Sequence, residues 1–218
     1  MQALDSTGEI IEKVLYGSIE EKVDALVTFN EVITINLSEN KESLIKNAEF
    51  ICRTFADVLD GIYYRYRDDF PTKFVDYLVK VFKKCFCIGF ITQNISEPEL
   101  RILVEVILLK LLPDNTKIIK DFSVSQELTK ELNAIVIHII EYSDSSTCFY
   151  TFLTLSEKYD SVADKSKMPQ ILAKWLVKLS RKVSDRIGSL NVERILLSLH
   201  SYLLRYSANQ SLITEGKS

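Results

Sequence analysis

Few side chains in this 218-residue sequence have the types and spacing that catalysis requires. The candidates are two histidines, His138 and His200, and four cysteines at positions 52, 85, 87 and 148. Cys148 with either histidine could form a nucleophile and base, but no residue flanking Cys148 favours its thiolate form. The GxSxG, Walker, HExxH and GxGxxG motifs are absent from the sequence. We therefore expect that the protein is not an enzyme; an enzyme with an unmarked site is the alternative.

Metal ligands are equally sparse. Cys85 and Cys87 lie two residues apart, so on a helix their side chains point about 200° apart and cannot share one ion. With only two histidines, a zinc site would need an unusual ligand set. The carboxylates Asp68 and Asp69 fit a polar turn in which Asp69 caps a helix that begins near Pro71. We expect no metal, no cofactor and four reduced cysteines in the core.

The composition is that of a globular protein built from helices. Hydrophobic residues make up 47% of the chain and charged residues 26%, enough for a sizeable core. Six glycines and four prolines are too few for the frequent turns of an all-β fold. No secretory signal is visible, so an intracellular protein is expected. The apolar run from Ile102 to Leu112 is interrupted by Glu105 and Lys110 and falls short of the ~20 residues needed to cross a membrane.

Hydrophobic residues recur at helical spacing along almost the whole chain, which predicts about nine helices. Ser18, after Gly17, should cap the second helix, and Ser96 with Glu99 has the pattern of a capping box. Gly61 is expected to end or loosen the third helix. The expected helices lie within residues 8–16, 19–33, 36–66, 68–91, 96–114, 123–142, 146–159, 166–185 and 189–206.

Consecutive amphipathic helices joined by short turns predict an all-α fold, an α-solenoid of HEAT-like antiparallel helix hairpins. Each hairpin leaves an apolar face that a neighbouring hairpin can cover. A closed helical bundle is the main alternative. We expect one domain over residues 1–207, with residues 208–218 as a flexible tail or the start of a linker.

Charge is distributed unevenly along the sequence. Residues 1–60 contain 12 acidic and 5 basic side chains, whereas residues 165–206 contain 9 basic and 2 acidic ones. This basic segment is either the solvated face of amphipathic helices or a surface for an acidic partner. Nucleic acid fits less well, because the net charge is −3 and the pI is about 5.6. The candidate partner-binding residues lie on roughly one helical face and are Lys174, Lys178, Arg181, Lys182 and Arg186.

Two aromatic features allow both a core role and a binding role. Trp175, the only tryptophan, lies in an apolar stripe and is expected in the core rather than as an exposed binding residue. The run of tyrosines and arginines from Tyr63 to Arg67 fits an interface and a seam between hairpins equally well.

The segment "SLNVERILLSLHSYLLRY" resembles the last conserved helix in the C-terminal domain of the TOG-array microtubule polymerases, the mini-spindles family. "SIEEKVDALVTFNEVI" resembles the first long helix of that domain and "LNAIVIHIIEYSDSSTCFYTFLTL" its middle hairpin, so the likeness extends over residues 10 to 206. Asn191 is expected to cap the helix, Leu196 and Leu197 to lie in the core, and Arg194 and His200 to be structural or at a hairpin seam. The positions that carry the resemblance are Asn191, Glu193, Arg194, Ile195, Leu196, Leu197 and His200.

The resemblance implies a TOG-like domain in a protein that promotes microtubule growth and organises the spindle. It further implies a location in the cytoplasm and cytoskeleton, at centrosomes and spindle, and recruitment through a coiled-coil partner of the transforming acidic coiled-coil (TACC) type. Tubulin-binding TOG domains present a tryptophan in their first inter-helix loop, and the turns at Tyr16–Ser18 and Asn36–Asn40 have none. A TACC adaptor role without nucleic acid or membrane is therefore favoured, and weak tubulin binding is the alternative.

Overall fold

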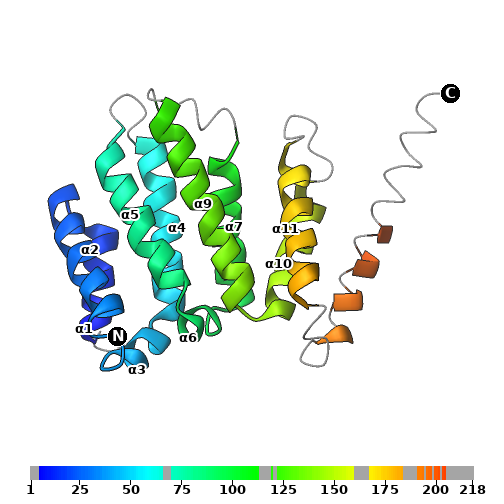
Figure 1. Ribbon diagram of the computed structural model, residues 1–218, viewed down its shortest axis with the longest axis horizontal. Helices are drawn as coiled ribbons and strands as arrows, with labels where there is room; N and C mark the ends of the chain where they lie inside the picture. Colours follow the sequence, from blue (N-terminus) through cyan, green and yellow to red (C-terminus); the bar gives the residue numbers. More distant parts are fainter. Residues whose placement is uncertain are drawn as a thin grey trace. The chain divides into compact units, whose positions relative to one another are not determined.

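The computed structural model describes residues 5–65, 70–112, 119, 122–159, 167–183, 191–193, 195–197, 199–201 and 203–204. All regular structure in these ranges is helical, with no strand, so the predicted all-α class is confirmed (Figure 1). The helices are α1 (Ser6–Tyr16), α2 (Ile19–Thr34), α3 (Lys41–Lys46), α4 (Ala48–Arg65), α5 (Thr72–Phe86), α6 (Gly89–Thr92), α7 (Glu97–Lys110), α9 (Phe122–Tyr142), α10 (Ser145–Tyr159) and α11 (Lys167–Val183).

The chain divides into two compact units, Met1–Ser143 and Asp144–Ser218. We describe each unit by itself. The single domain expected over residues 1–207 and the tail at 208–218 stay predictions.

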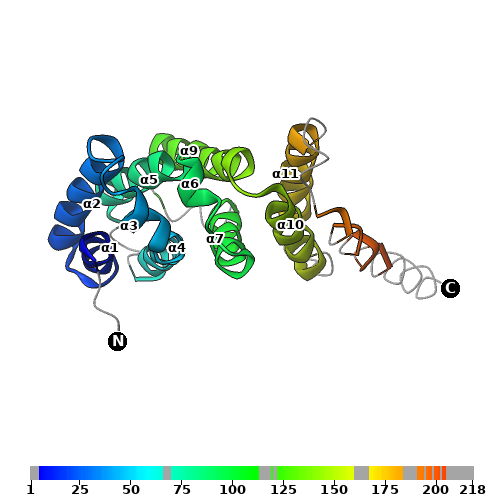
Figure 2. The ribbon, with the colours of Figure 1, turned by 90° about the horizontal axis from the view of Figure 1, so that it is seen from below.

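The N-terminal unit has two layers of helices. In Figure 2, α1, α4 and α7 form one layer and α2, α5 and α9 the other. Within the layers α1 packs on α4 and α4 on α7, while α2 packs on α5 and α5 on α9. Because each hairpin covers the apolar face of the next, this is the HEAT-like helical solenoid that the amphipathic pattern predicts. It is also consistent with the TOG-like fold that the resemblance implies.

A cluster of four phenylalanines joins the two layers. The rings of Phe55 from α4 and Phe82 from α5 stack with centroids 4.5 Å apart, and Phe29 from α2 lies 5.8 Å from Phe82. Phe86 completes the cluster 6.0 Å from Phe55. All four side chains are fully buried. Aromatic packing of this kind, with large buried area, holds adjacent hairpins together.

The cap predictions had different outcomes. Ser18 caps α2 as predicted, and its hydroxyl and the Glu21 carboxylate form a complete capping box. Ser96 occupies the N-cap of α7 but makes no capping hydrogen bond there. The capping box predicted for Ser96 and Glu99 is wrong, because the Glu99 carboxylate accepts hydrogen bonds of 2.8 and 3.0 Å from Arg53 of α4 instead.

Two of the expected helices are interrupted, whereas α4 is not interrupted at its glycine. The helix expected over 36–66 divides at Asn47, whose side-chain amide donates to the Asp5 carboxylate and to the Ser43 carbonyl. The helix expected over 68–91 ends at Phe86, before the short α6. The α4 helix continues through Gly61, so the expectation that this glycine ends the helix is wrong, and its loosening of the helix stays a prediction.

In the C-terminal unit, α10 packs against α11. Trp175 of α11 is 4% exposed and its ring lies 5.9 Å from that of Phe152 in α10, which confirms its expected place in the core. Further helical residues follow between 192 and 204. Among the residues that the structure describes, no helix is long and apolar enough to span a bilayer.

Candidate partner-binding surfaces

Helix α11 has one buried side and one basic side. Its buried residues recur every three or four positions and are Met168, Leu172, Trp175, Leu179 and Val183. This stripe packs the helix into the C-terminal unit, and the opposite face is left to solvent. Three basic residues of the sequence prediction, Lys174, Lys178 and Arg181, are exposed outside that stripe.

Three of the five candidate residues form one exposed stripe. Lys174, Lys178 and Arg181 are exposed and spaced by four and three residues, so successive positions lie one helical turn apart. Lys182 is half-buried, and Arg186 lies outside the described residues. A stripe of like charges on a rigid helix creates a positive potential that attracts an acidic surface.

The residues of the resemblance segment follow in the same unit. Asn191 precedes the helical residues, and its carbonyl accepts from the Ile195 N–H at 3.1 Å, as expected for a residue at the start of a helix. The Asn191 N–H donates to the Ser146 hydroxyl at 3.0 Å, which joins this start to α10. Glu193 and His200 are exposed, whereas Arg194 lies outside the described residues.

The expectation that Leu196 and Leu197 lie in the core is wrong. Their side chains are 57% and 62% exposed. Ile195 is the partly buried residue of this turn, and each further residue rotates about 100° around the helix axis. Leu196 and Leu197 are therefore turned away from the side that Ile195 buries.

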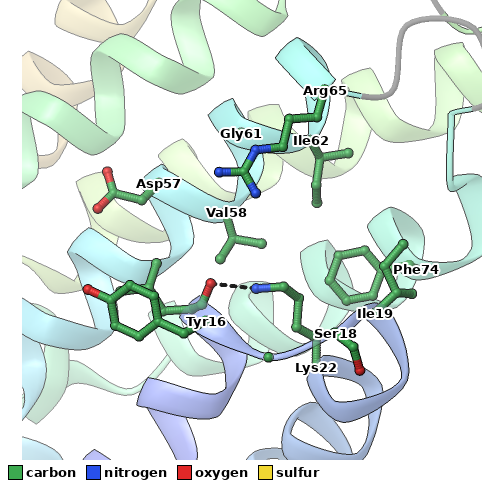
Figure 3. Close-up of a pocket in the computed structure, with 12 residues that line it drawn as sticks. Tyr16, Ser18, Ile19, Lys22, Asp57, Val58, Gly61, Ile62, Arg65 and Phe74 are labelled. Carbon is green, nitrogen blue, oxygen red and sulfur yellow. Dashed lines mark hydrogen bonds between the residues drawn. The ribbon is translucent and has the colours of Figure 1, made fainter.

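A cavity lies in the N-terminal unit, beside the turn between α1 and α2, and no sequence pattern indicated it (Figure 3). Its volume is about 300 Å³, and α1, α2, α4 and α5 all contribute to its wall. The polar side chains in the wall include Lys22, Asp57 and Arg65. Sequence reasoning missed it because these residues are far apart in the chain, and none belongs to a motif.

Two titratable groups of this cavity are shifted by their surroundings. The Lys22 ammonium donates to the carbonyls of Val14 and Leu15 at 2.7 and 2.5 Å, at the end of α1. Burial lowers the pKa of Lys22, and the nearby positive charge of Arg65 lowers it further. Burial raises the pKa of Asp57, against the opposing effect of Arg53.

The residues considered for catalysis differ in their exposure to solvent. Cys52, Cys85 and Cys148 are buried, and burial raises the pKa of the first two thiols. A buried thiol of this kind is a poor nucleophile. His200 is exposed. Asp68 and Asp69 lie outside the described residues, and among those described no three His, Cys, Asp or Glu side chains gather as metal ligands would.

The tyrosine and arginine run divides between two environments. Tyr63 is 3% exposed, and its ring lies edge-on to Phe70 at 4.9 Å, so this residue belongs to a packing seam. Tyr64 is 78% exposed, and Arg65 is exposed beside the cavity. Tyr66 and Arg67 lie outside the described residues.

Comparison with known proteins finds distant relatives. The chain is 20% identical over 211 residues to Protein MOR1 of Arabidopsis thaliana and 22% identical over 210 residues to Protein MOR1 of Oryza sativa subsp. japonica. Each alignment covers 89% of this chain but only 10% of the relative, so the chain spans about a tenth of the length of these proteins. No family model matches the chain. No solved structure matches it either.

Proposed function

We propose that this chain is a non-catalytic protein-interaction domain of a TOG-array microtubule polymerase, and that its α11 helix engages an acidic coiled coil of the TACC type. The observation that carries the proposal is the exposed basic stripe of Lys174, Lys178 and Arg181 on a helix fixed in place by buried Trp175. A row of three cations one turn apart matches the acidic positions that repeat along a coiled-coil surface.

The broader part of this proposal has two supports. The likeness to Protein MOR1, a TOG-array protein, extends over most of the chain and supports a TOG-like relationship. The paired helical layers of the N-terminal unit are the architecture expected of such a domain, and solenoids of this type commonly serve as docking surfaces. Association with microtubules follows from this relationship.

The finer part concerns the partner and the place of action. We propose that the coiled coil brings the protein to centrosomes and spindle microtubules within the cytoplasmic cytoskeleton. An acidic partner is favoured because basic residues outnumber acidic ones by 9 to 2 over residues 165–206. The same excess would place the contact in the C-terminal unit.

Charge reversal tests the partner surface. The variant with Lys174→Glu, Lys178→Glu and Arg181→Glu should bind a purified TACC coiled coil at least about tenfold more weakly, because three attractive pairs become repulsive. Pulldown with the immobilised coiled coil measures the loss. Circular dichroism should show unchanged helix content, since all three side chains are exposed.

A matched control reverses three exposed lysines in the N-terminal unit: Lys13→Glu, Lys41→Glu and Lys130→Glu. This variant carries the same number of reversed charges but should bind the coiled coil as the unmodified protein does. If both triple variants bound the coiled coil as tightly as the unmodified protein does, the α11 stripe would be rejected as the binding surface.

A weak tubulin-binding TOG domain that contributes to microtubule growth is the second candidate function. One observation favours it: Tyr16, the last residue of α1, is 76% exposed, which places an aromatic side chain beside the first inter-helix turn although that turn has no tryptophan. Co-elution with soluble αβ-tubulin on size exclusion, lost in Tyr16→Ala, would support this function. Absence of co-elution at tens of micromolar would count against it.

A further inference from the structure

The cavity beside the α1–α2 turn has two cations in its wall. Figure 3 shows the Lys22 ammonium and the Arg65 guanidinium reaching toward the same space from opposite sides, with Val58 between them. The hydrogen bonds to Val14 and Leu15 hold Lys22 in this position. The lysine is therefore oriented before any ligand arrives.

Arg65 has no anionic partner among the residues that the structure describes. It forms no hydrogen bond or ion pair there, although its guanidinium offers five donors in a planar fork. The acidic residue in the wall, Asp57, comes from the same helix and is seen to the left of Val58 in Figure 3. Two cations facing one space repel each other unless an anion lies between them.

A second hollow adjoins this cavity and is apolar. It has Ile19 and Phe74 in common with the cavity, and its wall also contains Val23, Phe70 and Tyr77. An occupant of both hollows would therefore place a negative group near Lys22 and Arg65 and an apolar group against Phe70 and Tyr77. Extended peptides present adjacent side chains of this kind to neighbouring pockets.

We propose that this end of the N-terminal unit binds an acidic–hydrophobic peptide segment of a partner protein, with a carboxylate between Lys22 and Arg65 and the neighbouring apolar side chain in the hollow lined by Phe70. The charge complementarity of the two cations selects an acidic peptide. None of the cavity residues belongs to the basic stripe of α11, so this site stands or fails independently of the proposed coiled-coil contact.

Gly61 provides a way to block the cavity without disturbing the fold. It lies in the cavity wall, and a Cβ atom added at this position would meet no atom within 4 Å. A larger side chain at Gly61 would therefore project into open space. Because glycine is a poor helix former, Gly61→Leu should keep α4 intact while filling the binding site.

The test uses a fluorescein-labelled peptide in which a glutamate precedes a phenylalanine, flanked by glycine and serine, and measures anisotropy with the full chain. The peptides in which glutamine replaces the glutamate, or serine replaces the phenylalanine, should each bind at least about fivefold more weakly.

Substitutions in the cavity wall test the protein side of the contact. Arg65→Ala should weaken peptide binding about tenfold, because a charge-assisted pair is lost. Gly61→Leu should abolish it. Asp57→Asn should strengthen it about threefold by removing a nearby negative charge.

Lys130→Ala, an exposed lysine of α9, is the control and should bind as the unmodified chain does. Amide shifts of Gly17 and Gly61 on peptide addition, followed by NMR, would place the contact in this cavity. Failure of the unmodified chain to bind the glutamate–phenylalanine peptide would overturn the proposal. The proposal would also be overturned if Arg65→Ala and Gly61→Leu, with unchanged helix content, both bound the peptide as tightly as the unmodified chain does.

Discussion

At the scale of single residues, two glycines in neighbouring positions of the fold have opposite surroundings. A Cβ atom on Gly17 would lie 2.7 Å from the Lys13 carbonyl oxygen and 2.9 Å from the Glu21 Cβ. The turn between α1 and α2 therefore closes only around a residue without a side chain. Gly61, in the last turns of α4, has open space where its side chain would be, so nothing in its surroundings requires glycine.

These surroundings predict opposite effects of alanine. Gly17→Ala should lower the free energy of unfolding by about 1–2 kcal/mol, because the backbone must move to relieve the clash. Gly61→Ala should raise it by about 0.5–1 kcal/mol, since alanine is the better helix former. Urea denaturation followed by circular dichroism measures both. A change of the same sign in the two variants would contradict this account.

A second residue-scale feature is the buried ammonium of Lys110. Its side chain is 8% exposed, its Nζ atom lies 2.6 Å from the Asp60 carboxylate, and it also lies 4.9 Å from the centre of the Tyr63 ring. The pair links α7 to α4. Since the lysine is buried, its charge depends on these partners for stabilisation.

Removal of the Asp60 carboxylate should therefore lower the free energy of unfolding more than removal of the Lys110 charge does. Asp60→Ala should lower the free energy of unfolding by about 1–3 kcal/mol, because it leaves a buried ammonium without its carboxylate. Lys110→Met, which removes the charge and keeps the aliphatic chain, should lower it less. Thermal or urea unfolding of the two variants distinguishes them. A larger loss in Lys110→Met than in Asp60→Ala would contradict the assignment.

At the scale of helices, the start of α1 depends on Asp5. Its carboxylate accepts from the Gly8 N–H at 2.9 Å and from the Asn47 amide at 2.9 Å, and it lies 3.6 Å from the Lys46 ammonium. Burial raises the pKa of Asp5, but these three groups, together with the Ser43 side chain, outweigh that effect and hold the pKa below its ordinary value. One carboxylate thus caps α1 and ties it to the boundary between α3 and α4.

The lowered pKa predicts an acid dependence of stability. A carboxyl group with a lower pKa in the folded state contributes stability above its unfolded value, about 3.8 here, and loses it as the pH falls through the folded value. Asp5→Asn keeps a capping oxygen but cannot titrate. Between pH 7 and pH 3, the unmodified protein should therefore lose more stability than Asp5→Asn. Urea midpoints at both pH values test this, and equal losses would count against the assignment.

Helix boundaries show where local sequence is sufficient and where it is not. Ser18 and Glu21 lie within one turn of each other, so the sequence alone specifies their capping box. Glu99 had the same local pattern beside Ser96, but Arg53, 46 residues earlier, takes its carboxylate. Asn47 interrupts an amphipathic segment because Asp5, 42 residues earlier, accepts from its amide. Partners distant in sequence decide these outcomes.

At the scale of the whole molecule, periodicity was enough to predict the all-helical class and the repeated hairpins, because a solenoid is built mainly from contacts between sequence neighbours. The exposed basic residues of α11 could also be predicted, since helical spacing turns Lys174 and Arg181 away from the apolar stripe that contains Trp175. The cavity could not, because Lys22 and Arg65 meet only after α1, α2, α4 and α5 pack together.

The central claim is that α11 binds an acidic coiled coil through charge. The most direct test is a charge-swap titration, measured by fluorescence anisotropy, between the Lys174→Glu, Lys178→Glu, Arg181→Glu variant and a TACC coiled coil whose surface glutamates are replaced by lysine. We predict that the variant binds the native coiled coil weakly and that the lysine-substituted coiled coil restores its binding, because each partner's charge is reversed. Equal binding of the native coiled coil by the variant and the unmodified chain would contradict the claim.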